Sequence, residues 1–162
     1  MREEEKLAQD VYTTLYNNWN VNIFRNIASS EATHTEAVRY LLKRYNLEDP
    51  VKIEKIGTFT NQELQELYND LVEKGKSSLK NAFIVGATVE DLDIKDLNDL
   101  IKQTNNQDIL TVYDNLIRGS RNHLRAFSKQ IENEGSTYTA QFISQEEIDK
   151  ILSATQERGN NR

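Results

Sequence analysis

The chain holds very few residues that can end a helix. Its 162 residues include one proline, Pro50, and six glycines. These two residue types disfavour a helix interior most strongly, and apolar residues elsewhere recur every three or four positions, as in amphipathic helices. The sequence therefore predicts an all-α protein. At about 100–200 residues per domain, it also predicts one domain with a substantial core.

Apolar stripes predict four long helices and two shorter ones. The long helices are expected at 3–19, 21–45, 77–104 and 108–134, and the shorter ones at 61–74 and 144–155. Gly75 is the expected stop of the first short helix, and Ser144 to Glu147 form a capping box that begins the second. An extended stretch is expected at 137–142.

Two helical hairpins joined by a long crossover describe a ferritin-like four-helix bundle. Residues 46–60 lack periodicity and contain Pro50 and Gly57, so they form the irregular part of this crossover. The bundle is expected to occupy 1–156, with a disordered tail at 157–162. The alternative is an irregular helical domain without internal symmetry.

Composition excludes several classes of protein and site. The chain has no cysteine, which excludes disulfides, thiolate zinc sites and iron–sulfur clusters. A net charge of −6 without long runs of like charge argues against a nucleic-acid partner. Mean hydropathy is −0.72 and no apolar run is long enough to span a membrane. The start, MREEEKLAQD, lacks the apolar stretch of a signal peptide, so the chain as it stands is expected in the cytoplasm, or outside it if a leader was removed.

Acidic and imidazole side chains interrupt the apolar stripes of all four long helices. Glu31 and His34 form an E-x-x-H pair that follows Ile27 by four and seven residues. The other residues at such positions are Glu4, Glu90, Asp93 and His123. Both histidines of the chain are in this set.

Two assignments near these stripes depend on helix register. Glu4 lies in a run of three acids, Glu3 to Glu5, so Glu5 is a rival for its place. Asp91 and Asp96 fall off the stripe and are expected to face solvent.

Carboxylates in the centre of a bundle need a counter-charge. A buried carboxylate costs several kcal/mol unless it is paired or bound to a metal, and several together repel one another. At about 1.5 Å per residue, Glu4, Glu31 and His34 would lie roughly 24, 17 and 21 Å from the first hairpin turn. The residues could thus share one layer, where two divalent cations would neutralise them. Iron, manganese and zinc all accept carboxylate and imidazole ligands.

The pattern of a Glu on one helix and E-x-x-H on the next, used twice, resembles the ligand set of ferritin-like di-iron carboxylate proteins. The segments EEEKLAQDVY, NIASSEATH, GATVEDLDIKDL and NLIRGSRNHLRAF resemble one prokaryotic branch of this superfamily, whose function is unassigned. The resemblance implies a dimetal site with ligands from four helices, namely Glu4, Glu31, His34, Glu90 and His123.

One position departs from that ligand pattern. The second E-x-x-H has Ser120 where the superfamily has Glu, so one carboxylate is missing. Asp93, one turn after Glu90, is our hypothesis for its replacement.

The sequence leaves three functions open. The first is a di-iron or iron–manganese oxidoreductase or ferroxidase that reacts with O2 or peroxide. The second is a non-catalytic helical module that binds a partner or holds metal in a degraded or zinc-filled site. The third is a bundle core that binds a small apolar molecule. Because such bundles often pair, a homodimer is the expected assembly.

Overall fold

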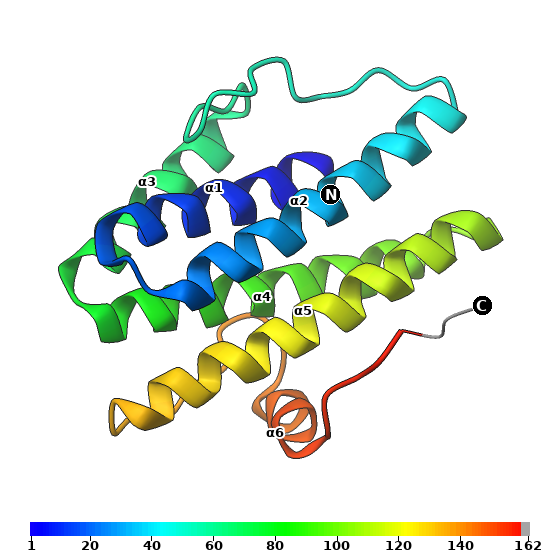
Figure 1. Cartoon of the computed structure of the whole chain (residues 1–162). Helices are drawn as coiled ribbons and strands as arrows, with labels where there is room; N and C mark the ends of the chain where they lie inside the picture. The colour runs from blue at the N-terminus through cyan, green and yellow to red at the C-terminus, as the bar shows by residue number, and fades with distance from the viewer. Residues whose placement is uncertain (160–162) are drawn as a thin grey trace. The chain divides into compact units, whose positions relative to one another are not determined.

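The computed structural model describes residues 1–159, and these residues are all-α (Figure 1). Six helices follow one another: α1 (Arg2–Trp19), α2 (Asn22–Arg44), α3 (Gln62–Ser77), α4 (Leu79–Ile101), α5 (Gln107–Asn133) and α6 (Gln145–Ser153). The chain divides into two compact units, Met1–Val85 and Gly86–Arg162, and the boundary falls within α4. None of the helices in the described part of the chain has the length and apolar character needed to cross a membrane.

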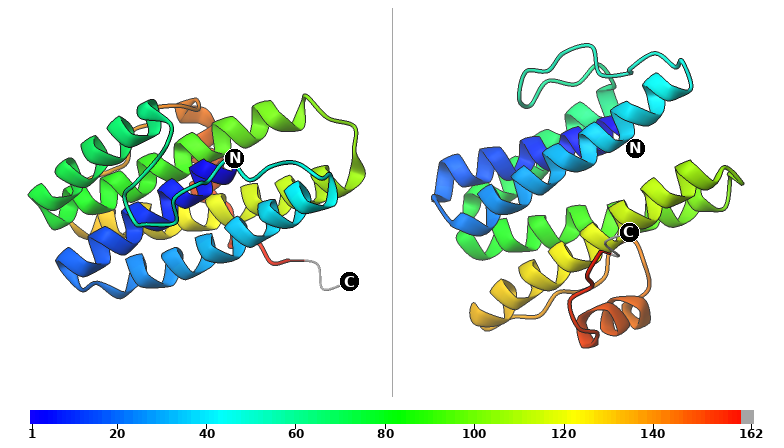
Figure 2. Two further views of the ribbon diagram at one scale, coloured as in Figure 1. Left: turned by 90° about the horizontal axis from the view of Figure 1, so that it is seen from above. Right: turned by 45° about the vertical axis from the view of Figure 1, so that its right-hand side comes forward.

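In the first unit, α1 and α2 form a helical hairpin (Figures 1 and 2). Asn20 ends α1 in the left-handed conformation, with φ 53°, and its N–H donates to the carbonyl of Tyr16 at 2.7 Å. Asparagine tolerates this conformation better than most residues, which explains the turn. The two long helices predicted at 3–19 and 21–45 are confirmed.

The helix α3 packs against α1, and its end differs from the prediction. Asn61 caps it by accepting hydrogen bonds from the N–H groups of Glu63 and Leu64. Gly75, the predicted stop, lies inside the helix. A Cβ at Gly75 would come within 2.6 Å of Leu15 Cδ2, so this glycine allows α3 and α1 to approach closely instead of ending α3.

The second unit contains most of α4 together with α5 and α6. A Cβ at Gly86 would lie 2.5 Å from Cε1 of Phe127, which shows how closely α4 and α5 pack. Ser144 caps α6 by accepting the N–H of Glu147 at 3.2 Å, as the capping box predicts. The Glu147 side chain contacts Asn98 of α4, so α6 is also tied to α4.

The expectation that Asp91 faces solvent is wrong. Asp91 is 0 % exposed and accepts hydrogen bonds from the Tyr138 hydroxyl and from three backbone N–H groups at 141, 142 and 143. The prediction from the apolar stripe took account only of contacts between the long helices. The stretch after α5, however, returns to cover this side of α4. By contrast, Asp96 is only half-buried and contacts Lys95.

The chain after α6 also returns to α5. Arg121 and Arg125 both donate to the Glu157 carboxylate, and Asn122 exchanges hydrogen bonds with the Glu157 backbone. Glu157 is the first residue of the predicted disordered tail, and the structure holds it by these contacts. Residues 160–162 lie outside the described part of the chain.

Candidate metal centre

The structure brings Glu5, not Glu4, to the side of α1 that faces α2. The Glu5 side chain is 1 % exposed, whereas that of Glu4 is 29 % exposed and lies 2.8 Å from the terminal amino group. Glu5 shares its face with Ala8 and Tyr12, three and seven residues later, and both of these are fully buried. The stripe through Leu7 and Val11, which points to Glu4, is equally buried, so apolar spacing alone does not single out Glu5.

On α2, Glu31 and His34 lie one turn apart and meet Glu5. His34 Nδ1 lies 2.8 Å from Oε2 of Glu31 and 3.4 Å from Oε2 of Glu5. Glu31 is 1 % exposed, and the His34 side chain is 12 % exposed. One ligand atom from each of the three residues lies within 4.8 Å of the others. We call Glu5, Glu31 and His34 the first-hairpin trio.

Burial and charge perturb the first-hairpin trio strongly. Burial raises the pKa of Glu5 to about 8, with the nearby Glu31 charge acting in the same direction and His34 acting against it. Burial lowers the pKa of His34, but hydrogen bonds and charge from Glu31 and Glu5 outweigh it and raise this pKa to about 10. The metal-free trio therefore holds protons at neutral pH that a cation would have to displace.

In the second unit, α4 and α5 bring another acid and imidazole together. His123 Nδ1 lies 3.4 Å from Oε1 of Glu90, which is completely buried. Ser120 is buried one turn before His123, at the position that corresponds to Glu31 in the first hairpin. We call Glu90 and His123 the second-hairpin pair.

Asp93 is buried on α4, one turn after Glu90. Among the described residues, however, it belongs to neither of the groups whose acid and imidazole ligand atoms lie within 4.8 Å of one another. Its replacement of the missing carboxylate at Ser120 stays a prediction.

Comparisons with known proteins connect the chain to one family. The uncharacterized protein MJ0754 of Methanocaldococcus jannaschii is 59 % identical over 162 residues, which cover 100 % of this chain and 88 % of that protein. The crystal structure of hypothetical protein MJ0754 matches with a TM-score of 0.95 at 58 % identity, over 97 % of this chain and 90 % of the other. The family model described as uncharacterized protein domain DUF2202 matches residues 1–155. The chain therefore belongs to the DUF2202 family.

Proposed function

We propose that the protein is a dimetal carboxylate protein of ferritin-like type. It binds two divalent metal ions, for which iron is our first candidate. With these ions it reacts with O2 or peroxide as an oxidoreductase or ferroxidase. The observation that carries this proposal is the first-hairpin trio. Its two carboxylates are almost completely removed from water and meet one imidazole. Buried acids in contact raise the free energy of the fold unless a counter-charge is present, and a divalent cation supplies that charge.

The donor set and its spacing fit a metal ion. Ligands held about 2.1 Å from one ion lie about 3–3.4 Å from one another. The Nδ1 atom of His34 lies 2.8 and 3.4 Å from the oxygens of Glu31 and Glu5. A cation can therefore take the place of protons shared among these atoms without a large movement of α1 or α2.

The second-hairpin pair supports a second cation. The α1–α2 and α4–α5 hairpins each carry an acid on the first helix and an imidazole on the second, and each imidazole turns Nδ1 toward that acid. This internal repeat, together with the crossover that contains α3, supports the ferritin-like four-helix arrangement. We assign Glu90, His123 and Asp93 to the second ion.

The chain's own residues prepare this chemistry. When bound, iron would supply the electrons that reduce O2 or peroxide. In the metal-free protein, the 2.8 Å hydrogen bond between His34 Nδ1 and Glu31 turns this nitrogen toward both carboxylates, where a cation would replace the shared proton. Burial keeps bulk water from the Glu5 carboxyl and raises its pKa to about 8, so a cation that binds there near neutral pH would release a proton.

Anaerobic Fe(II) titration of metal-stripped protein, followed by exposure to air, tests the proposal. We expect two irons per chain and oxidation faster than in buffer. Glu5→Gln should abolish the first binding event, while Glu4→Gln, the adjacent control, should bind iron as the wild type does. Less than one iron per chain, or equal losses in the two variants, would contradict the proposal.

Ser120 favours one alternative. Because α5 presents a hydroxyl where α2 presents a carboxylate, the second-hairpin pair is poorer in charge. A non-catalytic module that holds one zinc ion at the first-hairpin trio would fit this asymmetry. Elemental analysis of protein purified without added metal distinguishes the two: one zinc per chain and no iron uptake would favour the alternative.

A further inference from the structure

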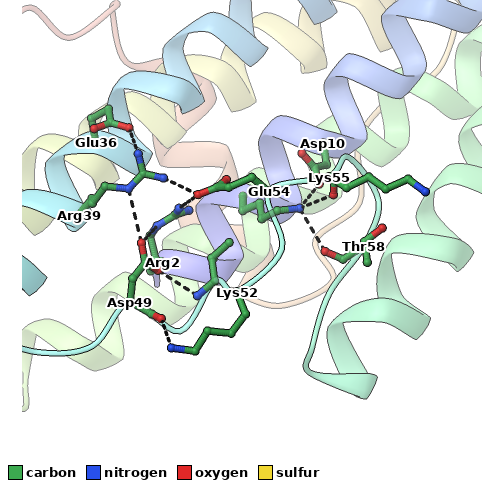
Figure 3. A network of polar contacts seen from close by, with 11 residues as sticks. Arg2, Asp10, Glu36, Arg39, Asp49, Lys52, Glu54, Lys55 and Thr58 are labelled. Atoms are coloured by element: carbon green, nitrogen blue, oxygen red, sulfur yellow. Dashed lines mark hydrogen bonds and ion pairs between the residues drawn. The ribbon is translucent and has the colours of Figure 1, made fainter.

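A stripe of charged residues on α1 lies next to Glu5 and faces the irregular connection. Arg2, Lys6 and Asp10 are spaced four residues apart, and all three are buried. Their partners lie in residues 48–60, which we call the strap. Figure 3 shows Asp49 and Glu54 of the strap beside Arg2, and Lys55 and Thr58 farther along it.

Arg2 is held by two acids of the strap. Its Nε lies 3.2 Å from Oδ2 of Asp49, and its Nη2 lies 2.9 Å from Oε1 of Glu54. Arg39 of α2 contacts the same two acids, at 3.5 and 2.6 Å. The Arg2 side chain is almost completely buried, and its Nη1 makes no hydrogen bond within the described residues.

A second clamp fixes the strap independently of Arg2. Lys6 Nζ donates to the backbone carbonyls of Lys55 and Thr58 at 3.1 and 3.3 Å and also binds Asp10. Asp10 in turn accepts the N–H of Gly57 at 2.9 Å. We therefore expect the strap to stay on α1 when the acids that bind Arg2 are changed.

The position of Arg2 makes it a competitor for the metal. It lies three residues before Glu5 on the same helix, a spacing at which opposite charges can pair. If Asp49 and Glu54 were neutralised, the buried Arg2 guanidinium would still need a negatively charged partner, because an unpaired buried charge is costly. Glu5 is a buried carboxylate within that spacing. A cation already paired with Glu5 would oppose binding of a divalent ion there.

We propose that Asp49 and Glu54 are positioning residues that keep Arg2 away from Glu5 and thereby reserve this carboxylate for the metal. This inference rests on the proposed function, because it concerns affinity at the first-hairpin trio. The strap is then a determinant of metal affinity as well as a structural connection.

The test is a cycle of variants in which Zn²⁺ affinity is measured by competition with a chromophoric chelator. Asp49→Asn with Glu54→Gln should weaken Zn²⁺ binding by about tenfold or more, since a charge-assisted contact is at stake. Adding Arg2→Gln to this double variant should restore the affinity, although not the thermal stability. Glu48→Gln, a change at an exposed strap acid, should leave the affinity unchanged.

The possible results separate the two proposals. If the wild type binds no Zn²⁺ or Fe(II), both the proposed function and this inference fail. If the wild type binds metal and the double variant binds it equally well, only the inference fails. Weakened binding that Arg2→Gln does not restore would mean that the acids act through folding alone and would also overturn the inference. Should the double variant not fold, Glu54→Gln alone, at the more exposed acid, gives the same comparison.

Discussion

The two hairpins place an acid and an imidazole in the same way, but they differ in what stands beside the imidazole. In α2, Glu31 contacts His34 at 2.8 Å, whereas α5 has the buried hydroxyl of Ser120 at the corresponding position. Their coverings differ as well. The strap is held by ion pairs to Arg2 and by hydrogen bonds to Lys6 and Asp10, whereas the stretch after α5 is held by hydrogen bonds to Asp91. The first hairpin therefore brings three candidate ligands together, whereas the second hairpin brings two.

The largest effect is expected at Asp91, which accepts more hydrogen bonds from its covering stretch than Asp10 accepts from the strap. Asp91→Ala leaves the Tyr138 hydroxyl and three backbone N–H groups without their acceptor. We expect a loss of about 3–5 kcal/mol in the free energy of unfolding. Asp96→Ala, at a half-buried acid on the same helix, should change it by less than about 0.5 kcal/mol. Urea unfolding measures both, and equal effects would contradict the anchoring role of Asp91.

The next effect concerns the acid that the second hairpin lacks. Glu31→Gln removes a ligand and weakens the orientation of His34, so affinity at the first-hairpin trio should fall by at least about 100-fold, beyond the range typical of outer-shell changes. Glu36→Gln, on the same helix but exposed, should leave it unchanged. Calorimetric titration with Zn²⁺ measures both. A wild-type affinity in Glu31→Gln would remove Glu31 from the ligand set.

Ser120→Glu makes the second hairpin resemble the first. The new carboxylate should strengthen binding of the second ion by about tenfold, because it adds a charged ligand. It should also lower the metal-free melting temperature, because one more acid is buried. Metal titration and thermal unfolding with and without metal measure the two changes. Unchanged affinity for the second ion would show that Ser120 does not correspond to a ligand position.

A pH series sharpens the account of the first hairpin. Burial raises the pKa of Glu5 to about 8, above its ordinary value of 4.5, so the folded chain binds a proton that the unfolded chain releases. Stability of the metal-free protein should therefore fall as pH rises from 5 to 8, and the raised pKa of His34 adds to this fall above pH 6.5. We expect the melting temperature to fall by at least several degrees over this range, at about 2–4 °C per kcal/mol. Glu5→Gln should flatten the curve, and an equally steep curve in that variant would assign the fall to other groups.

The smallest effect is expected at Asp93, the proposed helper of the second-hairpin pair. Asp93→Asn should weaken binding of the second ion by about tenfold, the lower end of the range for groups near a metal, because Asp93 is not in a group of ligand atoms within 4.8 Å. The first ion should bind as in the wild type. Two-site titration with Fe(II) under anaerobic conditions measures both steps. If stoichiometry and both affinities stay unchanged, Asp93 does not replace the missing carboxylate.

The helices and the positions of Glu31, His34 and His123 could be predicted from apolar periodicity, since the pattern depends only on residues three and four apart. Glu5 could not be separated from Glu4 in this way, because α1 is buried on two neighbouring stripes, one through Leu7 and one through Ala8. The role of Asp91 depends on a stretch about fifty residues later in the chain that folds back on α4. No local pattern records such a contact.

The strap shows the same limit. Arg2 and Lys6 stand at a charged helix start that is typical of a solvated surface, yet both are buried against acids and carbonyls of residues 48–60. Gly75 was likewise predicted to end a helix. In the structure, the absence of a side chain at Gly75 allows close packing against Leu15. In each case a partner distant in sequence decides the role of the residue.

Anomalous diffraction from crystals of metal-loaded protein tests the central claim most directly. With data collected at the absorption edge of iron or zinc, the account predicts a strong peak bounded by Glu5, Glu31 and His34, and none in crystals of Glu5→Gln grown with the same metal. A fully loaded protein whose peaks lie only at exposed acids, with none at the first-hairpin trio, would contradict it.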